Sequence, residues 1–239
     1  MATTIRNRLA LALDNTDDRE KIESLVEATA PCIGIYKVGL EQFIRFGPPI
    51  LETIRNAKRS IFLDLKLHDI PNTVAQAVRS ACDLGVDYLT VHTQGGSEML
   101  RAAVKAREKY SRNDGPAIIG VTLLTSIGAD ILRRELHVKV DVKEYVRRLA
   151  QTAVDAGADG IVCSAADLPF VKSLLPEPFI IITPGIRPAG CDAHDQQRVA
   201  APSAAIAAGS TILVLGRAVT AADDPAAAAE SIYNEIAHL

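Results

Sequence analysis

The sequence predicts an α/β fold, a (β/α)₈ TIM barrel formed as one domain over residues 1–239. Eight short apolar runs rich in β-branched residues alternate with amphipathic stretches of helical spacing, roughly one pair every 25–30 residues. Glycines in pieces such as A-G-A-D and L-G-V-D end several helical stretches just before a strand. No Pro/Ser/Gly-rich tract marks a linker, so one repeated unit accounts for the chain.

The elements follow in order along the chain. The expected strands are Leu9–Leu13, Gly34–Val38, Ile61–Leu67, Tyr88–His92, Ala117–Leu123, Gly160–Ser164, Phe179–Thr183 and Thr211–Leu215. The clearest expected helices are Arg19–Thr29, Leu40–Asn56, Thr73–Leu84, Glu98–Glu108, Val142–Ala156 and Pro225–Ile236. A doubly wound open sheet is the alternative, but the first turn after a strand, residues 14–17, lacks the G-x-G-x-x-G of a dinucleotide site. The barrel is favoured, and it places functional side chains at the carboxyl ends of the strands.

Composition excludes several classes of protein. The chain has 48% hydrophobic residues and a net charge of −3, with no apolar run as long as a membrane span and no basic block. We therefore expect neither a membrane nor a nucleic-acid partner. The four cysteines form no C-x-x-C pair, and the N-terminal segment lacks a secretory cleavage pattern. The expected location is the cytoplasm, and the expected ligand is a small molecule.

Charged residues inside apolar strands carry the strongest functional signal. In Ile61–Leu67 the period of two puts Asp64 and Lys66 on one face and leucines on the other, so the charged face looks into the barrel. Lys37 lies on the neighbouring strand, within reach of Asp64, and Asp69 follows in the next loop. Two lysines and two aspartates are thus expected to converge at the barrel mouth. A purely structural ion-pair network is the alternative, but four alternating charges at the functional face favour catalysis.

A second group of residues predicts a phosphate site. Thr183-Pro184-Gly185-Ile186-Arg187 follows the seventh strand, and Gly216-Arg217 follows the eighth. These two loops hold phosphate in many barrels, with backbone N–H groups exposed by glycine and a bidentate arginine. The polar segment between Arg187 and Gln196 has no strand or helix pattern, which is typical of a lid over a ligand or of a plain surface loop.

Six motifs, in this order, closely resemble the orotidine 5′-phosphate decarboxylase family over essentially the whole chain. They are Ala12-Leu13-Asp14, Tyr36-Lys37-Val38-Gly39, the block from Phe62 to Thr73 containing D-x-K-x-x-D-I-P-x-T, Val121-Thr122-Leu123-Leu124-Thr125-Ser126, Thr183-Pro184-Gly185-Ile186-Arg187 and Leu215-Gly216-Arg217. The D-x-K-x-x-D-I-P-x-T block is the most specific of them. The resemblance implies conversion of orotidine 5′-monophosphate to uridine 5′-monophosphate and CO₂ in pyrimidine biosynthesis, without metal or organic cofactor.

The resemblance also implies roles for individual residues. Lys66 would protonate C6 of the pyrimidine within a network of Lys37, Asp64 and Asp69. The remaining implied contacts are Asp14 and Lys37 with the ribose, Asp69 and Thr73 with the ribose of the partner subunit in a homodimer, Thr125 with the pyrimidine and the lid glutamine, and Arg187, Gln196, Gly216 and Arg217 with the phosphate.

Elementary chemistry agrees with a lysine in this position. Loss of CO₂ from C6 leaves an electron pair in an sp² orbital that the ring π-system cannot delocalise. An adjacent ammonium stabilises that charge and then supplies the proton. Carboxylates around Lys66 favour the charged form that this task needs.

Two other functions stay open at this point. His68 and His92 near the carboxylates would suit a magnesium-dependent relative that decarboxylates 3-keto-gulonate 6-phosphate, but that metal site needs an acidic residue where this chain has Lys37. A non-catalytic barrel that binds a phosphorylated ligand needs Arg187 and Arg217 but gains nothing from a buried Lys/Asp network.

Overall fold

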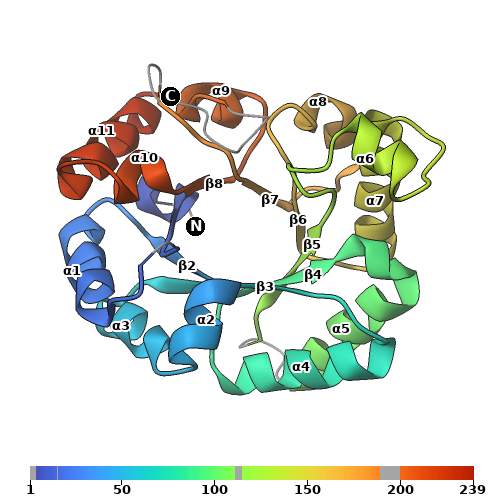
Figure 1. Cartoon of the computed structure of the whole chain (residues 1–239), viewed down its shortest axis with the longest axis horizontal. Coiled ribbons are helices and arrows are strands. Elements are labelled where there is room, and N and C mark those ends of the chain that lie inside the picture. The colour runs from blue at the N-terminus through green and yellow to red at the C-terminus, as the bar shows by residue number, and fades with distance from the viewer. Residues whose placement is uncertain (1–3, 15, 111–114, 189–199) are drawn as a thin grey trace.

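The computed structural model describes residues 4–14, 16–110, 115–188 and 200–239. Its strands are β1 (Leu9–Ala12), β2 (Ile35–Gly39), β3 (Ser60–Leu67), β4 (Tyr88–His92), β5 (Ala117–Val121), β6 (Gly160–Val162), β7 (Ile180–Thr183) and β8 (Ile212–Leu215). All pairs are parallel, neighbours follow chain order, and β1 pairs with both β2 and β8 (Figure 1). The predicted barrel is confirmed.

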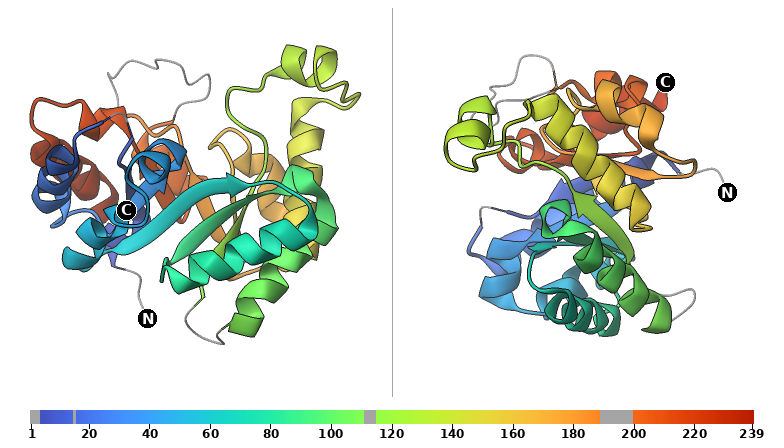
Figure 2. Two further views of the ribbon diagram at one scale, coloured as in Figure 1. Left: turned by 60° about the horizontal axis from the view of Figure 1, so that its bottom comes forward. Right: turned by 90° about the vertical axis from the view of Figure 1, so that its right-hand side faces the viewer.

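Helices surround the barrel. They are α1 (Arg19–Thr29), α2 (Leu40–Phe46), α3 (Ile50–Asn56), α4 (Pro71–Asp83), α5 (Gly96–Tyr110), α6 (Ala129–Arg134), α7 (Val142–Asp155), α8 (Leu168–Val171), α9 (Pro202–Ala207), α10 (Arg217–Thr220) and α11 (Pro225–Ala237), with short 3₁₀ turns η1 (Ile5–Arg8), η2 (Thr93–Gly95) and η3 (Lys172–Leu174). Figure 2 shows α4 and α5 side by side on the outside of the sheet. Within the described ranges, no helix is both long and apolar enough to cross a membrane.

One predicted helix was wrong. The stretch Leu40–Asn56 forms two helices, α2 and α3, because Gly47 adopts a positive φ of 62° and two prolines follow it. A proline lacks the N–H that a continuing helix needs, so the chain turns and starts again at Ile50.

Two apolar layers hold the barrel. Alternate strand residues such as Leu9, Leu11 and Leu63 point outward and pack beneath the helices. Their neighbours, among them Ala10, Ala12, Ile35, Phe62, Ile119, Ile182, Ile212 and Val214, fill the barrel interior. This period of two follows from the pleat of the strands.

At the amino-terminal end of the barrel, side chains accept hydrogen bonds from the backbone N–H groups of neighbouring strands. Asp87, just before β4, accepts a hydrogen bond from the backbone N–H of Ile61 in β3 at 2.7 Å. Asp159, just before β6, accepts from Ile118 of β5 at 2.8 Å, and Thr211, just before β8, accepts from Ile181 of β7 at 2.8 Å. These bonds satisfy strand N–H groups at one end and leave the other end for a ligand site.

Candidate active site

Strand β3 departs from a regular ladder where its charged residues begin. Leu63 pairs with Leu89 and Leu67 with Val91, so four residue steps on β3 match two on β4. Lys66 lies within this bulge at a φ of 50°, in the left-handed region. Its ammonium nevertheless reaches Asp64, with Nζ 2.8 Å from Oδ2, so the predicted shared face is confirmed.

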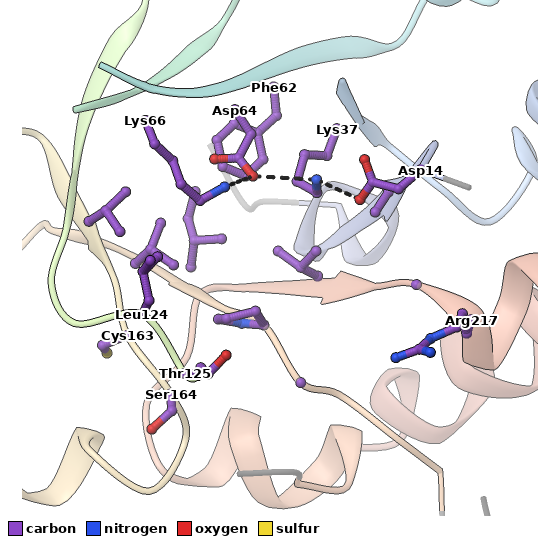
Figure 3. A pocket seen from close by; sticks show the side chains of 18 of the residues that line it. Asp14, Lys37, Phe62, Asp64, Lys66, Leu124, Thr125, Cys163, Ser164 and Arg217 are labelled. Carbon is purple, nitrogen blue, oxygen red and sulfur yellow. Dashed lines mark hydrogen bonds and ion pairs between the residues drawn. The ribbon is translucent and has the colours of Figure 1, made fainter. Parts of the chain in front are cut away.

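Four charged side chains form a continuous chain along the cavity wall (Figure 3). Lys37 Nζ lies 2.9 Å from Asp14 Oδ2 and 3.3 Å from Asp64 Oδ2, and Lys66 continues the series from Asp64. The predicted contact of Lys37 with Asp64 is therefore confirmed. Gly39 makes room for it, because a Cβ there would lie 2.6 Å from Asp14 Oδ1 and 3.2 Å from Lys37 Nζ.

Mutual attraction outweighs burial in this chain of charges. Burial alone would raise the pKa of Asp64, but the ammoniums of Lys37 and Lys66, with hydrogen bonds from Lys66 and Thr90, hold it below its usual value. Burial alone would lower the pKa of Lys37, but the carboxylates of Asp64 and Asp14 raise it. Both groups are thus charged at neutral pH.

Within a single chain, the fourth charge beside Lys37, Asp64 and Lys66 is Asp14, not the expected Asp69. Asp69 is exposed, and its Oδ1 accepts a hydrogen bond from the backbone N–H of Ile70 at 2.7 Å. A contact of Asp69 with the network of a partner subunit stays a prediction. Asp69 lies beyond the end of β3, where the chain turns outward into α4. Thr73, in the first turn of α4, is exposed as well, and among the described residues neither lines the cavity of its own chain.

A cavity of about 350 Å³ opens at the carboxyl ends of the strands. The predicted site residues that line it are Asp14, Lys37, Asp64, Lys66, Thr125, Arg187, Gly216 and Arg217. Figure 3 shows Lys66 and Asp64 on one wall of the cavity and Arg217 on the far side. The cavity thus separates an ammonium–carboxylate wall from an arginine end.

Both predicted arginines, Arg187 and Arg217, line the cavity. Arg187 is buried at 7% exposure, its backbone N–H donates to the carbonyl of Ala200 at 2.9 Å, and its Nη1 donates to the carbonyl of Ile186 at 3.0 Å. Arg217 is half-buried and begins α10 directly after Gly216. The expected partners Gln196 and most of the lid segment lie outside the described residues.

His68 and His92 lie close to each other, His68 exposed and His92 buried. The centroids of the two rings are 5.4 Å apart, and the buried Nδ1 of His92 has no hydrogen-bond partner among the residues that the structure describes. Burial, followed by His68 and Lys66, lowers the pKa of His92, so this ring is neutral at pH 7. Over the described residues no three His, Cys, Asp or Glu side chains are grouped to hold a metal, and the Lys37 ammonium occupies the space between the carboxylates.

Sequence reasoning missed several contributors. Phe62, Cys163 and Thr220 line the cavity, and Thr90 bonds to Asp64 without lining it. Cys163 is buried, and burial followed by Asp167 raises its pKa, so its thiol is neutral and forms part of the wall. The alternation within Tyr88–His92 was the available signal for Thr90, because it turns that residue inward.

Comparison with known proteins places these features in a family. The model of the orotidine 5′-phosphate decarboxylase / HUMPS family matches residues 7–232. An orotidine 5′-phosphate decarboxylase of Moorella thermoacetica is 44% identical over 97% of this chain and 92% of its own. One from Shewanella sediminis is 45% identical over 95% of this chain and 96% of its own. The crystal structure of orotidine 5′-phosphate decarboxylase from Lactobacillus acidophilus has a TM-score of 0.83 at 35% identity, covering 96% of this chain and 99% of that one.

Proposed function

This chain belongs to the orotidine 5′-phosphate decarboxylase / HUMPS family, and from that premise we propose how its cavity carries out the reaction. The reaction converts orotidine 5′-monophosphate to uridine 5′-monophosphate and CO₂ in pyrimidine biosynthesis. The observation that carries the proposal is the ammonium of Lys66, fixed 2.8 Å from the buried carboxylate of Asp64 at the cavity wall.

Lys66 is the proposed catalytic acid. The bond from C6 to the carboxylate breaks, CO₂ leaves, and the electron pair stays on C6. The Lys66 ammonium stabilises that pair and transfers a proton from Nζ to C6, after which solvent restores the proton on the amine. Asp64 orients Nζ, Lys37 helps to keep Asp64 ionised, and Asp14 helps to keep Lys37 protonated.

Binding would use the rest of the cavity. We assign the phosphate to Arg187, Arg217 and the backbone at Gly216, with Gln196 joining them, because two guanidiniums suit a dianion. The remaining assignments are Asp14 and Lys37 for the ribose and Thr125 for the pyrimidine. Phosphate contacts far from C6 supply binding energy that is realised at the transition state. We further propose a cytoplasmic location, where a charged nucleotide substrate of this pathway would be made.

A homodimer is the proposed assembly, with Asp69 and Thr73 reaching the partner's cavity. Both are exposed beyond the carboxyl end of β3. Large apolar side chains are exposed just after β2 and β3. Leu40 is 49% exposed and Ile44 79% exposed on α2, which follows β2, and Ile70 is 66% exposed after β3. An exposed apolar group of this kind beside polar site residues is typical of a protein interface.

The reaction is tested by the fall in ultraviolet absorbance of orotidine 5′-monophosphate. The wild type should consume it, and Lys66→Ala should lose more than about 99% of turnover because a general acid contributes about 10²-fold or more. Lys105→Ala, an exposed lysine on α5, serves as the matched control and should keep full activity. Binding of uridine 5′-monophosphate without any turnover by the wild type would favour the non-catalytic alternative.

The shared site is tested by mixing two inactive homodimers, Lys66→Ala and Asp69→Ala. A hybrid dimer then holds one site with both defects and one with neither. Random exchange makes about half of the dimers hybrid, so roughly a quarter of wild-type activity should return. If Asp69 served its own chain, every site would keep one defect, and demonstrated exchange without recovery would exclude the proposal.

A further inference from the structure

Thr90 on β4 contacts both Asp64 and Lys66 of the charged wall. Its side chain is 0% exposed, and Thr90 is not among the described residues that line the cavity. Its hydroxyl accepts a hydrogen bond from the backbone N–H of Lys66 at 2.8 Å and donates one to Asp64 Oδ1 at 3.0 Å. One buried hydroxyl thus contacts the backbone of the acid and the carboxylate that orients it.

The backbone contact stands where the strand ladder is interrupted. Asp64, Leu65 and Lys66 bulge between the paired residues Leu63 and Leu67, opposite the single residue Thr90. Lys66 has a φ of 50°, a backbone conformation that is uncommon for a residue other than glycine and that its surroundings must stabilise. At this interruption of the strand ladder, the Thr90 hydroxyl accepts the hydrogen bond of the Lys66 backbone N–H.

The carboxylate contact decides how Asp64 is oriented. A threonine hydroxyl carries one proton, and here it is directed at Oδ1. Oδ2 is then left to face both ammoniums, with Lys66 Nζ at 2.8 Å and Lys37 Nζ at 3.3 Å. Without the Thr90 hydroxyl, Oδ1 would lose its buried donor, and only the two ammoniums on Oδ2 would orient the carboxylate.

We propose that Thr90 is a positioning residue for the decarboxylation, holding the Lys66 backbone in its bulge and Asp64 Oδ2 against the two ammoniums. The inference rests on the proposed function and adds a residue from β4 to it. Thr90 acts through Lys66 and Asp64, so its loss should affect the chemical step more than ligand binding.

The test compares Thr90→Val, which removes only the hydroxyl, with Thr90→Ser, which keeps it. Thr90→Val should lower kcat about tenfold or more, the usual effect of a lost hydrogen bond to a charged group. KM and the affinity for uridine 5′-monophosphate should change less than about threefold, and Thr90→Ser should recover kcat to within about threefold of wild type. Thr29→Val is the matched control, because Thr29 is also buried and donates to the carbonyl of Leu25 at the far end of α1.

The pH profile separates positioning from a merely structural role. Asp64 is faced by Lys37 from β2, Lys66 from β3 and His92 beside Thr90 on β4, with Asp14 behind Lys37. Removing the Thr90 hydrogen bond raises the pKa of Asp64, so the acid limb of kcat should move to higher pH in Thr90→Val and stay in place in Thr29→Val.

Two results would overturn the proposal. One is wild-type kcat with an unshifted acid limb in Thr90→Val. The other is an equal loss of kcat in Thr90→Val and Thr90→Ser with a parallel loss of uridine 5′-monophosphate binding. If Thr90→Val does not fold, as judged by circular dichroism, Thr90→Ala removes the same hydroxyl and is read in the same way. Failure of the proposed function is distinct, since the wild type itself would then leave orotidine 5′-monophosphate unchanged.

Discussion

Replacing Lys37 by methionine should destabilise the barrel through the carboxylate that it leaves behind. Lys37 and Asp64 have side chains 11% and 9% exposed, 3.3 Å apart. At an effective dielectric constant of about 20, that separation corresponds to about 5 kcal/mol of attraction. Lys66 still faces Asp64 at 2.8 Å, and removing a buried ammonium also removes its desolvation cost. We therefore expect the free energy of unfolding at pH 7 to fall by about 3 kcal/mol, the lower end for breaking a buried pair.

The loss in free energy of unfolding caused by Lys37→Met should become smaller as the pH falls. The pKa of folded Asp64 is depressed in the wild type, so its stabilisation is present above the unfolded pKa of about 3.9 and is lost as pH falls through the folded pKa. In Lys37→Met the folded pKa of Asp64 rises, and the carboxyl takes up a proton sooner as pH falls. The difference between wild type and variant should therefore shrink between pH 7 and about pH 4.

Urea unfolding followed by circular dichroism measures both effects. The double variant Lys37→Met/Asp64→Asn supplies the matched comparison, because it removes both charges of the pair and should recover most of the loss. A deficit below about 1 kcal/mol, or a double variant less stable than Lys37→Met, would refute the reasoning that Lys37 stabilises the fold by neutralising Asp64.

Three further outcomes are expected. Arg217→Ala should lower kcat/KM for orotidine 5′-monophosphate about 10- to 100-fold and leave turnover of a phosphate-free analogue unchanged; equal losses on both would make the arginine structural. Gly39→Ala should weaken binding of uridine 5′-monophosphate, measured by calorimetry, because its Cβ would displace the Asp14 carboxylate from 2.6 Å; unchanged affinity would contradict that contact. Exhaustive EDTA treatment should leave kcat unchanged, and activity restored by Mg²⁺ but not by buffer exchange would favour the magnesium-dependent alternative.

Much of the site could be predicted from sequence because short-range rules decide it. The period of two within Ile61–Leu67 turns Asp64 and Lys66 to one face, and parallel strands about 4.8 Å apart bring Lys37 beside them. The barrel itself follows from repetition of one unit, and the arginine positions follow from the strand ends. The break between α2 and α3 also had a signal in the sequence, which the prediction of a single helix did not use: Gly47 and the two prolines after it are typical of a helix end.

Only the tertiary structure decided which groups complete the network. Within one chain, Asp14 is the fourth charge beside Lys37, Asp64 and Lys66, because the chain leaves β3 outward into α4 and carries Asp69 away from its own cavity. The positive φ of Lys66 and its bond to Thr90 depend on an unequal register of β3 and β4. Register between two strands is set by the packing of the whole barrel, whereas the face that a residue occupies within one strand is set by its immediate neighbours.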